Sequence, residues 1–228
     1  MSTRLADNTY GRAQLPGISQ EFDFCDAEDI TSFTTTALAS GSIGAASGIN
    51  GVVRFTGAAT TNNSGAQIQQ ETAEIDIEAG GVYSTEARIR LNDTAERLVF
   101  GFIEVNANLL GSIANGVHLV KAAGASGAWS LVIVRASGGT TTIALPQLAA
   151  DTSWHVYYLR LEASRSNAND GTLTLSKDGL VVYQGPVSSN APGDVAVTPS
   201  VCIASGSASG TQTGDLDYLR WKGTRSPN

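Results

Sequence analysis

The sequence predicts an all-β fold, a sandwich of two antiparallel sheets preceded by an extended N-terminal arm. Short runs with an apolar residue at every second position recur along the 228 residues, and no stretch shows a convincing helical pattern. Hairpin-turn signals separate several of these runs: Asn-Asp at 92–93, Gly-Gly at 138–139, Asn-Asp-Gly at 169–171 and Lys-Asp-Gly at 177–179. Hydrophobic residues make up 42% of the chain and charged residues 15%, which suits a large core and an exterior kept polar by Ser, Thr, Asn and Gly.

Twelve of these runs are predicted to be strands, and their short, regular spacing is typical of a sandwich or barrel. They cover residues 52–55, 66–70, 74–78, 82–91, 97–105, 116–122, 129–136, 140–145, 154–163, 172–176, 180–185 and 215–223. Gly, Asn, Asp, Ser or Pro bound the runs, because these residues favour turns.

Three segments fall outside this rhythm. Residues 1–19 combine charge, Pro16 and glycines with little periodicity, so they are predicted to form an arm that becomes ordered only against a partner. Residues 34–50 are small and polar and are predicted to be a surface loop or an edge strand, while residues 26–33 could form a short helical turn. The predicted organisation is an arm at 1–19 and one β-sandwich domain at 20–228.

The charge balance and the cysteines narrow the class of protein. The net charge is −7, without the cluster of Lys and Arg that phosphate binding requires, so no nucleic-acid partner is expected. The first residues lack the apolar core of a signal peptide and no run of 18 apolar residues occurs, so we expect a protein made in a cytoplasm and not held in a membrane. Cys25 and Cys202 are expected to be small buried residues, with a disulfide as the less favoured alternative.

Four stretches together resemble the concanavalin A-like lectin/glucanase jelly roll. They are EARIRL at 86–91, DTSWHVYYLRLE at 151–162, SKDGLVVYQ at 176–184 and GDLDYLRW at 214–221. The resemblance covers roughly residues 20–223 and implies the fold. It is only weakly specific for function, because the same sandwich carries lectins, glycosidases, and adhesive or capsid proteins.

Residues 74–78, EIDIE, are the stretch that suggests catalysis. They match the catalytic strand of the β-1,3/1,4-glucanase family, which implies that Glu74 is the nucleophile, that Asp76 supports it and that Glu78 is the acid/base. Alternate residues of a strand share a face, and a retaining glycosidase needs two carboxyl groups about 5–5.5 Å apart. The resemblance therefore implies a candidate active site.

The arrangement of the chain speaks against that assignment. In the glucanase family the catalytic strand follows a Tyr-Gly-x-x-Glu-x-Arg strand, whereas here residues 74–78 precede the similar residues 83–88, and their flanks offer only Tyr83 as an aromatic platform. The preferred interpretation is an amphipathic strand with Ile75 and Ile77 inward and the three acidic side chains in water. No catalytic residue is assigned.

Metal sites are not expected either. Asp217 matches the last-strand Asp that helps to hold a structural calcium ion in the glucanase branch, but an Asp that hydrogen-bonds nearby backbone is preferred. His118 and His155 each lie in a predicted strand without a second ligand at suitable spacing, so a zinc site is not expected and no cofactor is assigned.

The three tryptophans are candidates for the core or for stacking against a sugar. Trp154 lies in the segment that resembles a core strand and is predicted to be buried. Burial is also preferred for Trp129 and Trp221, with a sugar platform as the alternative.

The preferred function is a non-enzymatic virion structural protein of a tailed phage, a capsid decoration or cement protein that binds the major capsid protein. This interpretation comes from a resemblance to such proteins, because the chain is rich in Gly, Ser, Thr and Ala and has a predicted N-terminal arm. It implies location in the virion and a homo-oligomer, with a trimer as one form. A carbohydrate-binding phage adhesin, with a glycan partner, is the alternative, and a glucanase using Glu74 and Glu78 is the third.

Overall fold

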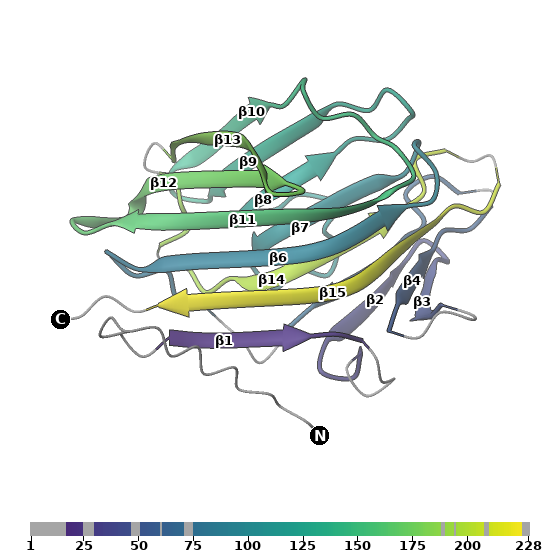
Figure 1. The fold of residues 1–228 in the computed structure, drawn as a ribbon, viewed down its shortest axis with the longest axis horizontal. Helices are drawn as coiled ribbons and strands as arrows, with labels where there is room; N and C mark the ends of the chain where they lie inside the picture. The colour runs from purple at the N-terminus through teal and green to yellow at the C-terminus, as the bar shows by residue number, and fades with distance from the viewer. Residues whose placement is uncertain are drawn as a thin grey trace.

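A computed structural model describes residues 17–24, 30–46, 51–59, 61–70, 75–187, 190–193, 195–207 and 210–224. These residues form fifteen strands in two antiparallel sheets that lie face to face (Figure 1). The predicted all-β, two-sheet sandwich is confirmed. Within the described part of the chain there is no helix long and apolar enough to cross a membrane.

The eight-stranded sheet contains the long strands of the second half of the chain. In spatial order its strands are β13 (Leu180–Pro186), β12 (Asn167–Lys177), β11 (Trp154–Ser164), β6 (Val82–Leu91), β15 (Thr213–Thr224), β4 (Val53–Thr56) and β3 (Ser42–Ala45), and β1 (Gly17–Phe22) pairs with the second half of β15. Residues in β6 are alternately half-buried and buried along the whole strand. This period of two matches the sequence pattern and means that one face of the strand lies in the core and the other outside.

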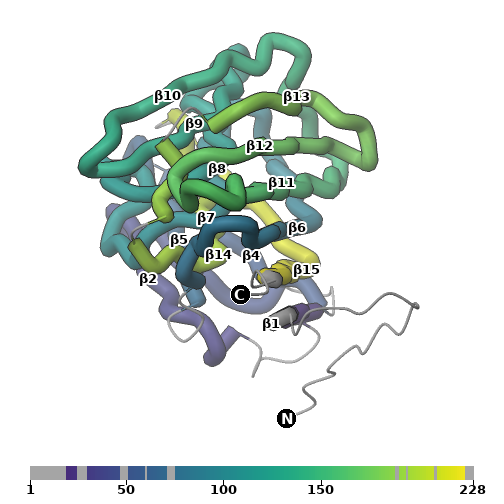
Figure 2. The backbone as a smooth tube through the Cα atoms, turned by 90° about the vertical axis from the view of Figure 1, so that its left-hand side faces the viewer, coloured from purple at the N-terminus to yellow at the C-terminus, as the bar shows by residue number. Residues whose placement is uncertain are grey.

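The seven-stranded sheet packs against it. Its order is β10 (Gly139–Ala144), β9 (Trp129–Arg135), β8 (Gly116–Lys121), β7 (Arg97–Ile103), β14 (Thr198–Ala204), β5 (Gly65–Gln69) and β2 (Thr34–Leu38). Side chains of both sheets fill the space between them, and Phe55, Phe100 and Phe102 are the largest aromatic residues that are fully buried there. Figure 2 views the molecule from the side on which β15 ends, so that β1 and β15 are seen nearly end-on.

Several strand predictions differ from the structure. The strand at Thr198–Ala204 was not predicted because every residue in it is buried, so it shows no alternation of apolar and polar residues. Residues 34–50 contain two edge strands, β2 and β3, which fits the edge-strand alternative. The predicted turn at 169–171 is wrong, since these residues lie within β12 and the turn is at 165–166. The turn at Asp178 and Gly179 is confirmed, and both residues have positive φ.

The first described strand ties the N-terminal region to the last strand. Gly17 lies opposite Thr224 and Phe22 opposite Leu219 in an unbroken antiparallel register. The final residues of the predicted arm thus belong to a sheet. Residues 1–16 lie outside the described residues, so the arm stays a prediction, and so does the first half of the predicted helical turn, residues 26–29.

Candidate functional site

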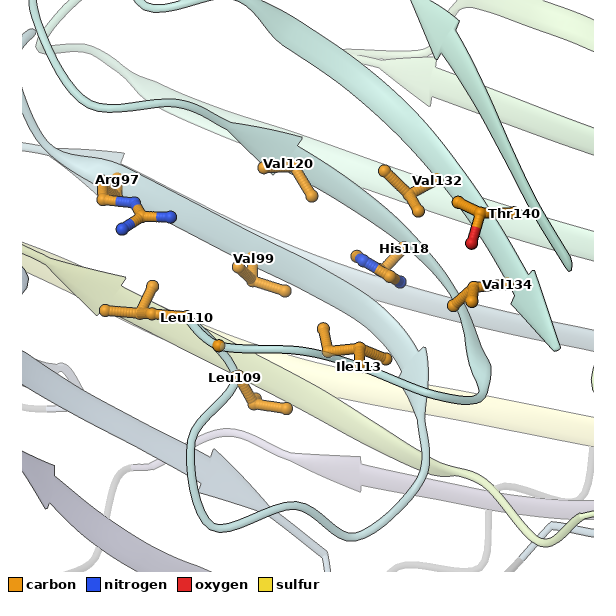
Figure 3. A pocket seen from close by; sticks show the side chains of 11 residues that line it. Arg97, Val99, Leu109, Leu110, Ile113, His118, Val120, Val132, Val134 and Thr140 are labelled. Atoms are coloured by element: carbon orange, nitrogen blue, oxygen red, sulfur yellow. The ribbon is translucent and has the colours of Figure 1, made fainter. Parts of the chain in front are cut away.

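The outer face of the seven-stranded sheet is crossed by the connection between β7 and β8. This β7–β8 connection, residues 104–115, leaves β7 and folds over the sheet before it enters β8 (Figure 3). Leu109 at its centre is only 1% exposed. It packs in an apolar cluster with four residues of the sheet: Leu38, Val99, Ile103 and Cys202. The connection is therefore anchored by burial of its own apolar side chain.

Two glutamine side chains on β5 bind the backbone of the β7–β8 connection. Gln67 donates from Nε2 to the Asn106 carbonyl (2.6 Å), and its Oε1 accepts from the Leu109 amide (2.8 Å). Gln69 donates to the Glu104 carbonyl (3.1 Å) and accepts from the Asn106 amide (2.9 Å). Both glutamines are buried, so breaking any of these bonds would leave a polar group without water or partner. These hydrogen bonds hold the connection in place over the sheet.

The carboxylate of Glu104 braces the same connection from within. Its Oε1 accepts a hydrogen bond from the Ala114 amide (2.8 Å) and its Oε2 accepts one from Asn115 Nδ2 (2.8 Å). Asn115 in turn accepts a hydrogen bond from the Ala136 amide (3.1 Å) at the β9–β10 turn. Both oxygens of Glu104 are thus engaged in holding the loop.

A hollow of about 190 Å³, which we call the trough, lies between the β7–β8 connection and the sheet (Figure 3). Aliphatic side chains of β7, β8, β9 and the connection form most of its surface, including Val99, Leu110 and Val132. Three polar side chains also reach it: Arg97, His118 and Thr140. An apolar concavity with a few polar groups is the usual form of a small-ligand site.

His118 lies in the middle of the trough residues (Figure 3) and is only 3% exposed. It sits opposite Gly101 of β7, where a Cβ would come within 2.7 Å of the His118 Cα, so that only glycine leaves room for this side chain. Burial lowers the pKa of His118 to about 4, so the ring is neutral at pH 7. Its Nδ1 is buried and has no hydrogen-bond partner among the described residues.

Arg97 and Thr140 bring the other polar groups to the trough. Arg97 donates from Nη1 to Asn63 Oδ1 (2.6 Å), while its buried Nε has no partner within the described ranges. Thr140 adds a hydroxyl from the edge strand β10. A neutral imidazole, a guanidinium and a hydroxyl together offer both donors and acceptors on an otherwise apolar surface.

The outward positions of β7 and β8 bear on the resemblance to glucanases, because these strands follow the EARIRL strand in the chain. The outward residues of β7 are Arg97, Val99, Gly101 and Ile103, and those of β8 are Gly116, His118 and Val120. A carboxylate stands at none of these seven described positions. The pair of carboxyl groups that a retaining glycosidase needs is not formed by these two strands.

The predicted strand at 74–78 is largely absent from the sheets. Ile75 makes an isolated bridge with Val197, and residues 76–78 belong to no strand, because this segment crosses from β5 in one sheet to β6 in the other. The predicted burial is confirmed, since Ile75 is 6% and Ile77 2% exposed. Asp76 is exposed and Glu78 half-buried, while Glu74 lies outside the described residues.

Asp217 and His155, two of the candidates for metal binding, pair with other side chains. Asp217 accepts a hydrogen bond from Arg88 Nη1 (2.6 Å), so a guanidinium cation already neutralises it, and this does not fit a calcium ligand. His155 contacts Asp178 Oδ2 through Nδ1 (2.6 Å) and Asp151 Oδ1 through Nε2 (2.8 Å). The described residues contain no group of three or more His, Cys, Asp or Glu that could hold a metal ion.

The cysteine and tryptophan predictions have mixed outcomes. Cys202 is a buried free thiol, as expected of a small buried residue, while Cys25 lies outside the described residues. Trp129 and Trp221 are buried, at 4% and 5% exposed. The predicted burial of Trp154 is wrong, because it lies opposite Arg90 on the outer face of the eight-stranded sheet and is only half-buried.

Trp154 belongs to a surface that the sequence analysis missed, which we call the charged face. Asp215, with a fully buried side chain, accepts hydrogen bonds from Arg54 Nε (2.7 Å), from Asn92 Nδ2 (3.0 Å) and from Arg90. The guanidinium groups of Arg90 and Arg88 lie 4.8 and 4.9 Å from the centre of the Trp154 ring. Charged residues occupy alternate positions on these neighbouring strands, and this pattern is present in the sequence. Only the strand register shows that the charged residues of neighbouring strands lie together.

Comparison with known proteins shows the fold. No protein-family model matches the chain, and no curated protein matches it either. Among solved structures, peanut lectin is 11% identical with a TM-score of 0.62, over 93% of this chain and 100% of the lectin chain. An endo-1,3-β-glucanase from Streptomyces sioyaensis is 14% identical with a TM-score of 0.60, over 96% of this chain and 99% of the other.

A phage protein module is similar to the same degree. The CBM2 module of the evolved Dit protein of Lactobacillus casei BL23 phage J-1 is 14% identical with a TM-score of 0.62, over 94% of this chain and 99% of the module. At these identities the similarity establishes a shared fold and leaves activity open. The chain thus has the concanavalin A-like lectin/glucanase jelly-roll fold that its sequence predicts.

Proposed function

We propose that the chain is a non-enzymatic carbohydrate-binding protein that takes a sugar into the trough. The observation that carries this proposal is the outward surface of β7 and β8, where Val99, His118 and Val120 border an apolar hollow and no carboxylate stands among the described outward residues. Such a surface can hold a ligand, but it lacks an acid and a base to cleave one. The lectin and the phage carbohydrate-binding module with the same fold support this choice.

The lining of the trough suits one sugar ring. A pyranose combines a face of C–H groups with a rim of hydroxyls, which matches aliphatic walls interrupted by a few donors and acceptors. The volume of about 190 Å³ is below the roughly 300–1,000 Å³ of sites for drug-sized ligands. We therefore expect a terminal or protruding residue of a glycan to enter, with the rest of the glycan outside.

A glycan array with purified protein tests this proposal. Leu110→Asp places a charge in the trough and should lower the signal for bound glycans at least tenfold. Val105→Asp is the matched control, because Val105 lies in the same β7–β8 connection, is 56% exposed and does not line the trough. Absence of any glycan signal, or equal loss in both variants, would contradict trough binding.

An assay for reducing sugar released from laminarin or lichenan tests the non-enzymatic part. We expect no release above background. Release that disappears in Glu78→Gln would show that residues 74–78 act as in glucanases and would overturn the proposal.

A virion decoration protein is the second candidate, and the charged face favours it. Arg, Tyr and Trp are the side chains most often found at the energetic centres of protein interfaces. The charged face combines five arginines, Arg54, Arg88, Arg90, Arg160 and Arg220, with the aromatic residues Trp154, Tyr158 and Tyr218. In this role the face would dock on the major capsid protein, and the chain would be found in the particle.

Mass spectrometry of purified particles and sedimentation with empty capsids test the second candidate. Arg160→Glu reverses a charge on the β11 side of the charged face and should reduce the pelleted protein at least tenfold. Arg165→Glu makes the same change in the β11–β12 turn, outside the face, and should pellet as the unchanged protein does. Pelleting of none of the three proteins, or of all three equally, would remove the support for this docking surface.

A further inference from the structure

The edge strands β10 and β13 lie side by side along one side of the sandwich (Figures 1 and 2). Two hydrogen bonds connect this region: Gln147 Nε2 donates to the Val182 carbonyl (2.6 Å), and Asn190 Nδ2 donates to the Thr141 hydroxyl (2.7 Å). Each strand is the last of its sheet, so each has backbone N–H and C=O groups that point away from the sheet without a strand partner.

The β10 edge lacks the devices that usually prevent edge pairing. Charged residues, proline within the strand and bulges are the common ones. Residues 136–150 contain no charged residue, Pro146 follows the strand, and β10 pairs with β9 in an unbroken register from Gly139 to Ala144. β10 is therefore uncharged, without a bulge along β9, and has no strand partner among the described residues on its other side.

The neighbouring edge adds exposed apolar surface. Leu180 at the start of β13 is 73% exposed and Val181 is 61% exposed. In the described part of the chain, these are two of the three large apolar residues that are this exposed, and the third is Val105. The opposite edges, β2 and β3, have no large apolar side chain so exposed within the described residues.

We propose that β10 pairs with β10 of a second copy of this chain, antiparallel about a twofold axis, and that Leu180 and Val181 become buried beside this pair. Charge favours a second copy at this side. Each copy has a net charge of −7 and repels another, but residues 136–150 and 179–193 carry no charge, so this side can meet its own copy without opposing charges. An antiparallel pair of identical strands is self-complementary, and its symmetry closes at a dimer.

The dimer would also affect ligand binding in the trough. This consequence rests on the proposed function, whereas the pairing itself does not. Thr140 lies on β10 and lines the trough (Figure 3). Pairing of β10 would join two seven-stranded sheets into one, with both troughs on the same face. A glycan with two ends could then engage both troughs, which raises the apparent affinity without any new contact.

Sedimentation velocity across the micromolar range tests the pairing. The unchanged protein should shift from monomer to dimer as concentration rises. Thr142→Lys on the exposed β10 edge and Leu180→Lys on β13 should each weaken dimerisation at least tenfold. Thr35→Lys on the opposite edge strand β2 is also an exposed threonine and should leave the dimer unchanged.

A cysteine at the pairing edge tests the symmetry directly. Thr142→Cys lies near the centre of β10, so two copies should form a disulfide-linked dimer under oxidised glutathione, whereas Thr35→Cys should not. The proposal is overturned by a monomer at all concentrations, by a dimer that neither lysine variant weakens, or by open oligomers that Thr35→Lys also disrupts. Leu180→Lys keeps the test decisive if Thr142→Lys fails to fold, because Leu180 is mostly exposed.

Discussion

The outer faces of the two sheets are stabilised in different ways. Each sheet buries one face in the core and must stabilise the other. The charged face of the eight-stranded sheet does so with cross-strand ion pairs around Asp215, whereas the seven-stranded sheet covers apolar side chains with the β7–β8 connection. The first face is closed by its own charges, and the second leaves a trough between the sheet and its cover.

The difference shows where a jelly roll can keep a ligand site. A charged face whose carboxylates are already bonded to guanidinium groups offers few free groups to a small ligand. An apolar face under a fixed loop keeps buried polar atoms, such as His118 Nδ1 and Arg97 Nε, that have no partner among the described residues. An unpaired buried polar atom costs free energy that a ligand can recover by pairing with it, so the seven-stranded sheet is the better place for a site.

The largest effect is expected from breaking the charged face at its buried centre. Asp215→Ala removes the acceptor shared by Arg54 and Arg90 and should lower the free energy of unfolding by about 3 kcal/mol, measured by urea denaturation. Burial alone would raise the pKa of Asp215, but hydrogen bonds from Arg54, Arg90 and Asn92 hold that pKa below its usual value. This contribution is present at neutral pH and is lost as pH falls through the lowered pKa.

Asp217→Ala is the matched control on the same strand. Asp217 is 23% exposed and its partner Arg88 is 42% exposed, so water can replace their interaction and the loss should be at most about 1 kcal/mol. Equal losses for Asp215→Ala and Asp217→Ala would show that burial does not distinguish the two ion pairs.

On the other face, His118 should make stability depend on pH. Its pKa in the folded protein is about 4, below the ordinary value of 6.5, so the unfolded chain binds a proton between these values and the folded protein does not. Stability should therefore fall as pH drops from 6.5 toward 4, by about 2–3 kcal/mol at pH 4.5. The measurement is urea unfolding at pH 7 and 4.5, and the same difference in His118→Asn would show that another group is responsible.

A smaller effect is expected from releasing the cover over the trough. Gln67→Met keeps the length of the side chain but leaves the Leu109 amide and the Asn106 carbonyl without partners, at a cost of about 1–2 kcal/mol. Hydrogen exchange of the β7–β8 connection should become faster while the strands keep their protection. Gln184→Met, at an exposed position of β13, is the control and should change neither quantity.

The sequence predicts the fold well because alternation survives where one face of a strand is buried. In β6 and β11 every second residue lies in the core, and both strands were predicted within one residue of their observed ends. The fully buried β14 has no alternation, and the segment at 75–78 alternates although it belongs to no sheet, since Ile75 and Ile77 reach the core while crossing between the layers. The local sequence pattern indicates which residues are buried, but which strands pair with one another depends on the tertiary structure.

The candidate site was less accessible from the sequence. His118 was considered only as a zinc ligand, because nothing local to GVHLVK shows that the connection preceding this strand folds back over it. The partners of Gln67 lie 39 and 42 positions away in the chain, so the role of this residue depends on contacts that no short window contains. Trp154 was placed in the core because the strand register that puts it opposite Arg90 cannot be read from one strand alone.

The smallest effect is expected at the periphery of the charged face, and it sharpens the contrast with Asp215. Arg160 Nη2 lies 2.9 Å from Glu162 Oε1, but the two side chains are 43% and 45% exposed. Water and salt screen such a pair, and ordering two long side chains costs about as much free energy as the pair gains. Glu162→Gln should therefore change the free energy of unfolding by no more than about 0.5 kcal/mol, and by less as salt is added. A salt-dependent loss above about 1 kcal/mol would show that the charged face acts as one cooperative network, and the division between a buried centre and a weak periphery would be wrong.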